Sequence, residues 1–105
     1  MIHMADKIDD SKYLWTDKTD DGHTRIGLND LARNEIGQVT FAEFPEKLTQ
    51  VEDGDPILSF EGAKAVTEIH TPVAGKVARI NSDLIEHPEL LNEDNRDKTW
   101  IVELF

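Results

Sequence analysis

The chain has 105 residues, no cysteine, and 22 acidic against 11 basic side chains, which give it a formal charge of −11 at pH 7. Without cysteine it can form no disulfide, no thiolate nucleophile and no Cys-ligated zinc or iron–sulfur centre. So negative a chain disfavours nucleic acid and anionic lipid as partners, because cationic side chains are needed to displace their counterions. The length predicts one domain with a single modest core.

The N-terminal residues 1–11 are polar and lack periodicity, and we expect them to form a flexible lead-in before one domain over residues 12–105. They hold acidic residues where a signal peptide would have its apolar segment, and no apolar run of about 18 residues follows. The sequence therefore predicts a soluble, cytoplasmic protein.

The first half of the domain predicts paired strands and one short helix. The elements expected in chain order are a strand over 12–17, a strand over 23–29, a helix over 30–37 and a strand over 38–44. A turn at Asp21-Gly22 joins the first two strands, and the helix is expected to be capped by an acidic residue and to stop at Gly37. In the last strand Val39 and Phe41 alternate as core-facing residues, with a slip at Ala42.

The second half predicts shorter strands and more closely spaced turns. After a turn over 52–56, the expected elements are strands over 56–62, 65–73 and 76–81, a helical stretch over 82–90 and a closing strand over 99–105. A further turn is expected at Ala74-Gly75. About seven short strands at this spacing indicate an all-β fold, a small sandwich or barrel with helix only in the connections.

A search for catalytic and metal-binding patterns gives no candidates. The histidines His3, His23, His70 and His87 show no metal-binding spacing, and His70, on a strand, is expected to be a packing or surface residue. The acidic turn over 52–56 lacks the further oxygen ligands of a calcium loop. We therefore expect no enzyme activity from the chain's own residues, and any redox chemistry would come from an attached cofactor.

Lys64 is unusual in its surroundings. Gly62, Ala63 and Ala65 place only small residues around it, at a bend between two predicted strands. A lysine that protrudes from a stiff β hairpin suits modification by an enzyme that reaches it from outside. Spacing alone favours the other interpretation, an ordinary solvated lysine in a hairpin.

The segments FEGAKAVTEIHTPVAGKVARIN, HPELLN and TWIVEL together resemble the H protein of the glycine cleavage system, over about residues 13–105. In that family the lipoylated lysine lies in a Glu-x-x-Lys-Ala hairpin before a Pro-Val-x-Gly turn. The resemblance implies that Lys64 is the lipoylated residue, with Glu61 and Ala65 at the neighbouring motif positions. Further positions that match the family are Ile26, Gly27, Gly37, Pro45, Pro72, Val73, Gly75, Asn81, Pro88, Glu89, Leu90 and Asn92.

The resemblance implies a barrel-sandwich hybrid of two small antiparallel sheets and a carrier without catalytic residues. Its cofactor would be lipoic acid attached covalently at Lys64, which would supply the redox and transfer chemistry. The implied partners are a lipoate ligase or lipoyl transferase, dihydrolipoamide dehydrogenase, the pyridoxal-phosphate glycine decarboxylase and the folate-dependent aminomethyltransferase.

Two departures from the family pattern keep alternatives open. The chain stops at Phe105, where H proteins usually continue into a helix, and residues 96–99 (RDKT) replace the glycines that typically precede the late Trp100. Both features resemble a short H-like variant with lipoate ligase, macrodomain and sirtuin-type partners, in which the carrier is reversibly ADP-ribosylated in oxidative-stress response. We weigh this variant slightly above an aminomethyl carrier of glycine cleavage.

Two other readings are weaker. Biotin carriers share the fold, but their lysine normally lies between methionines, whereas alanines flank Lys64. An unmodified adaptor domain would act through its acidic surface alone.

Overall fold

A computed structural model describes residues 10–63 and 66–105, which form two antiparallel sheets with short helices between them. The elements in chain order are η1 (Ser11–Tyr13), β1 (Leu14–Lys18), β2 (Thr24–Leu28), α1 (Asp30–Ile36), β3 (Val39–Glu43), β4 (Gln50–Val51), β5 (Pro56–Gly62), β6 (Val66–His70), β7 (Gly75–Ile80), α2 (Asp83–Glu86), η2 (Pro88–Asn92), α3 (Arg96–Thr99) and β8 (Trp100–Leu104).

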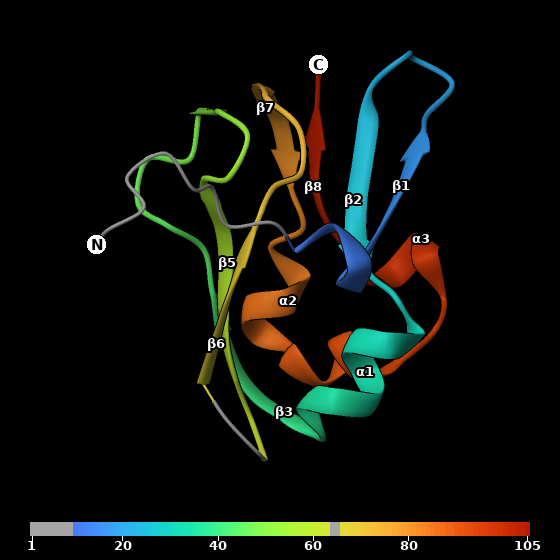
Figure 1. The fold of residues 1–105 in the computed structure, drawn as a ribbon, viewed down its shortest axis with the longest axis vertical. Coiled ribbons are helices and arrows are strands. Elements are labelled where there is room, and N and C mark those ends of the chain that lie inside the picture. Colours follow the sequence, from blue (N-terminus) through green and yellow to red (C-terminus); the bar gives the residue numbers. More distant parts are fainter. Residues whose placement is uncertain (1–9, 64–65) are drawn as a thin grey trace, which may run out of the picture.

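The two sheets share the strands unequally. The larger sheet has the order β1-β2-β8-β7-β4, and the smaller has the order β3-β5-β6. In Figure 1 the smaller sheet stands beside the larger one, and the helical segments lie below and between them. The predicted all-β, two-sheet architecture is confirmed.

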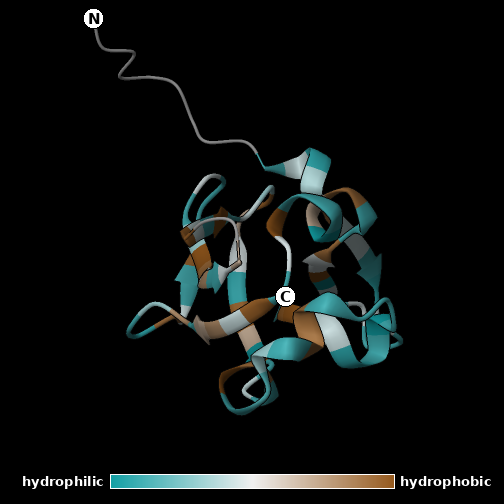
Figure 2. Cartoon of the chain, turned by 90° about the horizontal axis from the view of Figure 1, so that it is seen from below, coloured by the Kyte–Doolittle hydropathy of each residue, from teal (hydrophilic) through white to brown (hydrophobic). Residues whose placement is uncertain are grey.

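The core lies between the sheets and is built from their inward side chains. The largest fully buried members are Phe60, Ile26, Leu28, Ile57, Leu58, Leu84, Leu91, Ile101 and Val102. Figure 2 shows apolar and polar segments interleaved along the strands, with the connecting loops mostly hydrophilic. This is the pattern expected when one face of each sheet is buried and the other meets water.

Helix α1 begins at Asp30, at the start of the predicted segment, but its capping residue differs from the prediction. The capping residue is Asn29, whose side chain accepts a hydrogen bond from the backbone N–H of Ala32 at 3.1 Å, and not an acidic residue. The helix ends at Gly37 as predicted, with φ 72° and ψ −161°. Only glycine adopts this backbone conformation without strain, so the helix must turn into β3 at this residue.

The expected inward position of Phe41 is wrong. A register irregularity between Val39 and Phe41 places two residues of β3 opposite one of β5, so the alternation is reset at this point. Val39 and Ala42 are buried, whereas Phe41 is 52% exposed. The slip predicted at Ala42 therefore occurs earlier, between Val39 and Phe41, and it moves an aromatic ring to the surface.

Smaller differences concern element ends. The sequence did not indicate β4 or α3, and β6 is shorter than the predicted strand. Gly75 begins β7 and does not adopt positive φ, because the chain reverses over residues 71–74 instead. Asp10, within the predicted lead-in, contacts His70, while residues 1–9 lie outside the described residues. Within the described ranges, no helix has both the length and the apolarity to cross a membrane.

Candidate functional site

The predicted modification hairpin is formed by β5 and β6. These strands pair in the register Glu61↔Val66, Phe60↔Thr67 and Ser59↔Glu68, and they join through residues 63–65. Lys64 and Ala65 lie outside the described residues, so their predicted roles rest on the strands that flank them. Glu61, the third predicted motif residue, is exposed at the end of β5.

The base of this hairpin is fixed to the rest of the domain by backbone contacts. Gly62 lies so close to the end of α1 that a Cβ atom there would collide with the carbonyl oxygen of Ile36. The backbone N–H of Ala63 donates to the carbonyl oxygen of Gln38 at 2.9 Å. The last described residue before Lys64 is therefore held by the segment that links α1 to β3.

Asn92 in turn holds that linking segment. Its amide oxygen accepts from the backbone N–H of Val39 at 2.8 Å, and its amide nitrogen donates to the carbonyl oxygen of Gly37 at 2.7 Å. One side chain thus satisfies a donor and an acceptor on either side of Gln38. Asn92, which matched the family pattern, therefore has a positioning role: it holds the residues on both sides of Gln38, and Gln38 binds Ala63 of the hairpin.

A second polar arrangement holds the start of the folded chain against β6. The carboxylate of Asp10 lies 2.8 Å from the backbone nitrogen and 2.9 Å from Nδ1 of His70, and Glu68 lies 3.0 Å from Nε2 of the same ring. His70 is buried, as one of the two predicted alternatives had it. Sequence reasoning did not link it to Asp10, because 60 residues separate the two.

A largely apolar pocket of about 190 Å³ lies beside β6 and α1. Its lining is formed by Asp10, Tyr13, Ala32, Glu35, Ile36, Thr67 and Ile69. Strand β6 forms one wall, so the same strand that leaves the hairpin also borders this pocket. A small apolar group could be shielded from water there.

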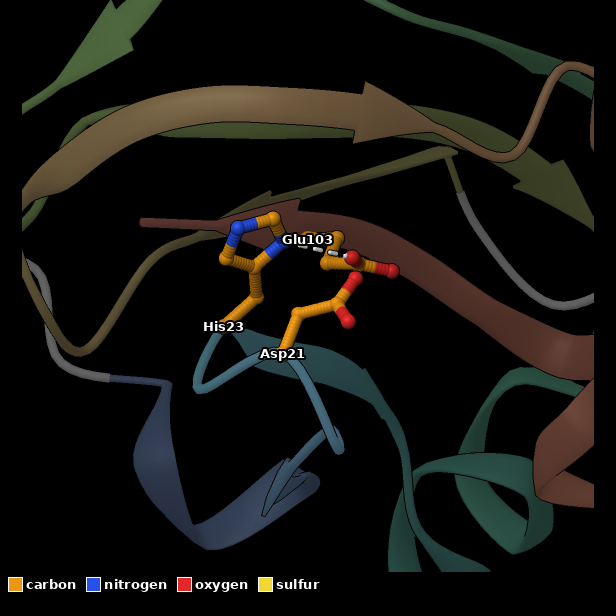
Figure 3. Close-up of side chains that lie close together, drawn as sticks. All are labelled: Asp21, His23 and Glu103. Carbon is orange, nitrogen blue, oxygen red and sulfur yellow. Dashed lines mark hydrogen bonds and ion pairs between the residues drawn. The ribbon is translucent and has the colours of Figure 1, made fainter.

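The third polar cluster, around Glu103, is a structural ion-pair network. Figure 3 shows Asp21 and His23, from the turn before β2, next to Glu103 of β8, and their ligand-type atoms lie within 4.8 Å of one another. Glu103 is only 3% exposed, and it accepts hydrogen bonds from Arg79 at 2.8 Å and Arg25 at 3.1 Å. The two guanidinium groups that bind Glu103 would repel a metal cation at this carboxylate, so the arrangement favours an ion-pair network over a metal site.

The network changes the titration of Glu103. Burial alone would raise the pKa of this carboxyl, but the hydrogen bonds from Arg79, His23 and Arg25 outweigh it and lower the pKa from 4.5 to about 2. Both arginines also lie over the Trp100 ring, with centroid distances of 5.0 Å for Arg25 and 5.2 Å for Arg79. The cluster therefore joins β2, β7 and β8 on the outer face of the larger sheet.

Comparison with known proteins identifies relatives along almost the whole chain. The model of the family described as Glycine cleavage H-protein matches residues 7–105. A glycine cleavage system H protein of Oceanobacillus iheyensis is 42% identical over 85 residues, which cover 81% of this chain and 68% of that protein. A probable glycine cleavage system H protein of Thermococcus kodakarensis is 40% identical over 90 residues, covering 86% and 66%.

A solved structure supports the fold independently. The crystal structure of a glycine cleavage system H protein from Mycobacterium marinum superposes with a TM-score of 0.75, at 22% identity, over 90% of this chain and 78% of that chain. The chain spans about two thirds of the length of the curated relatives it matches.

Proposed function

The chain belongs to the glycine cleavage H-protein family, and from this premise we propose that it is a lipoyl carrier whose arm is attached to Lys64. Proteins of this family are carriers and not catalytic enzymes, and they hold lipoic acid covalently on a lysine. The family resemblance read from the sequence is thereby confirmed. The attachment residue in this chain is the step that we add.

The observation that carries the proposal is the fixed base of the β5–β6 hairpin. Gly62 and Ala63 lie against Ile36 and Gln38, so the last described residues before Lys64 have a fixed position on the domain. A bound lipoyl group supplies a reversible disulfide for redox and group transfer. The chain's own residues supply a rigid platform, and Tyr13, Ile36 and Ile69 offer apolar surface beside β6.

Tethering suits such a carrier because the arm's end group is presented to successive enzymes at a high effective concentration. We propose as partners a lipoate ligase or transferase, dihydrolipoamide dehydrogenase and enzymes that use the loaded arm. The acidic surface favours encounter with basic surfaces on these enzymes.

Two roles for the lipoylated protein remain, and one observation favours each of them. Residues 96–99 replace the glycines expected before Trp100 and form the short helix α3, which favours the H-like variant with macrodomain and sirtuin-type partners, ADP-ribosylation and a role in oxidative stress. The printed names of the relatives favour aminomethyl transfer in glycine cleavage.

Lys64→Arg is expected to abolish lipoylation completely. With lipoate, ATP and a lipoate ligase, the wild-type mass should increase by one lipoyl group, whereas the variant mass should not change. Because the substitution keeps the charge, its free energy of unfolding should stay within about 0.5 kcal/mol of wild type. Intact-mass spectrometry gives the first result and denaturant unfolding gives the second. A lipoylated variant would show that another lysine carries the arm.

An exchange assay distinguishes the glycine cleavage role from the role of the H-like variant. Fully lipoylated protein is added to purified glycine decarboxylase and aminomethyltransferase, and glycine–bicarbonate exchange is followed with labelled bicarbonate. The glycine cleavage system H protein of Oceanobacillus iheyensis in the same assay is the positive control. Exchange comparable to this control supports glycine cleavage, and its absence supports the variant system.

A further inference from the structure

We propose that the outer face of the β3-β5-β6 sheet is the docking surface for the enzyme that attaches lipoate, a surface defined here as the hairpin face: Phe41, Glu43, Ser59, Glu61, Val66 and Glu68. This inference rests on the proposed function, because it concerns the loading of Lys64. It adds the surface that a loading enzyme recognises and the chemistry of its partner surface.

The hairpin face is built from two cross-strand rows. In the row next to the 63–65 connection, Phe41 pairs with Glu61 and Glu61 pairs with Val66. In the following row, Glu43 pairs with Ser59 and Ser59 pairs with Glu68. The row with the two apolar side chains is thus the one nearest to the predicted modification residue.

Phe41 and Val66 are exposed apolar side chains on the same face of the smaller sheet. Phe41 is 52% and Val66 is 74% exposed, although the same two strands bury Ala42 and Ile69. Strand β5 lies between the strands that carry Phe41 and Val66, so the two side chains are roughly 10 Å apart across the sheet. One partner surface can therefore contact both. The irregularity in β3 is what turns Phe41 to this side.

The negative charge of the hairpin face indicates a positively charged surface on its partner. It has three glutamates and no basic residue, and within the described part of the chain Glu43 and Glu61 form no ion pair with a cation. Protein interfaces commonly combine an apolar centre with a charged rim. The complementary surface is therefore an apolar patch that lysine or arginine side chains border, with the basic residues speeding encounter.

The loading enzyme is the partner with the greatest need for such a surface. It must recognise the protein before any lipoyl arm exists, so its affinity comes from the protein surface around Lys64. An enzyme that uses the loaded arm can also bind the arm itself. Substitutions on the hairpin face should consequently affect loading first.

The test measures loading kinetics in variants that keep strand-forming residues. Phe41→Thr combined with Val66→Thr is expected to raise the KM of a lipoate ligase for the unlipoylated protein at least about fivefold, with little change in kcat. Glu43→Lys should raise KM as well and weaken its dependence on salt. Rates are taken from intact mass over time, and thermal unfolding shows that each variant is folded.

Matched controls lie at the opposite end of the molecule. Figure 1 places the C-terminus at the top, away from the lower ends of β3, β5 and β6. Phe105 is 64% exposed, so Phe105→Thr removes a comparable aromatic surface there, and Asp20→Lys, in the β1–β2 turn, is the matched charge reversal. Both should leave KM unchanged.

The possible outcomes distinguish failure of the docking surface from failure of the proposed carrier function. Wild-type protein that is lipoylated at Lys64, together with an unchanged KM in the Phe41/Val66 double variant, overturns the docking face and leaves the carrier function intact. Equal effects of the face variants and their controls also overturn it. A wild-type protein that is never modified overturns both proposals.

Discussion

Gly62→Ala is expected to destabilise the protein by about 2 to 4 kcal/mol, because overpacking at backbone contacts cannot be relieved by a side-chain movement. The added Cβ would meet the carbonyl oxygen of Ile36, the last residue of α1. Gly62 is itself paired with Val39, so strand β5 cannot move without disturbing β3. We expect the denaturant midpoint to fall without a change in m value, and lipoylation by a ligase to slow because the base of the hairpin is displaced.

Gly22→Ala is the matched control. Gly22 has φ 84°, but a Cβ atom there meets no atom within 4 Å. Its cost should be about 1 kcal/mol, from the left-handed backbone alone, and lipoylation should be unaffected. A loss below about 0.5 kcal/mol in Gly62→Ala would mean that α1 gives way easily and that the hairpin base is not rigid.

The strands could be predicted where turn chemistry and alternation coincide. Strand β5 was predicted at its observed bounds because Pro56 and Gly62 delimit an apolar run. Strand β4 has only two residues, too few to show alternation, and α3 has four, too few for a helical period. Phe41 was misplaced because a bulge resets alternation, and the pairing that creates it lies 20 residues further along the chain.

The site was predictable as a motif but not as a set of contacts. The hairpin and its lysine follow from local sequence and from the family resemblance. The contacts of Ala63 with Gln38 and of Asn92 with Gly37 and Val39 depend on how β3 and η2 meet in the fold. Glu103 is part of an ordinary-looking strand, and its partners Arg79, Arg25 and His23 lie 24, 78 and 80 residues away.

Glu103→Gln is expected to lower the free energy of unfolding by about 3 kcal/mol at pH 7, since a lowered pKa measures how strongly the folded state favours the ionised form. The Glu103 pKa of about 2 in the folded protein, against 4.5, corresponds to this amount. The amide cannot compensate both guanidinium groups, so Arg25 and Arg79 would lose the charge that holds them over Trp100.

The same values fix the direction of the pH dependence. Because the folded pKa is depressed, the contribution of Glu103 is fully present above pH 4.5 and is lost as the pH falls toward about 2. The stability difference between wild type and Glu103→Gln should therefore be constant from neutral pH to about pH 5 and should shrink below it. Comparing the two proteins at each pH cancels the titration of the other carboxylates.

Urea unfolding of both proteins between pH 2 and pH 7 measures this difference directly. Asp17→Asn is the matched control, since Asp17 accepts from Arg96 at 2.7 Å in a pair whose side chains are both 54% exposed. Solvent screens such a pair, so this variant should lose less than about 1 kcal/mol. A Glu103→Gln protein as stable as Asp17→Asn would mean that burial offsets the three hydrogen bonds and that the network does not stabilise the larger sheet.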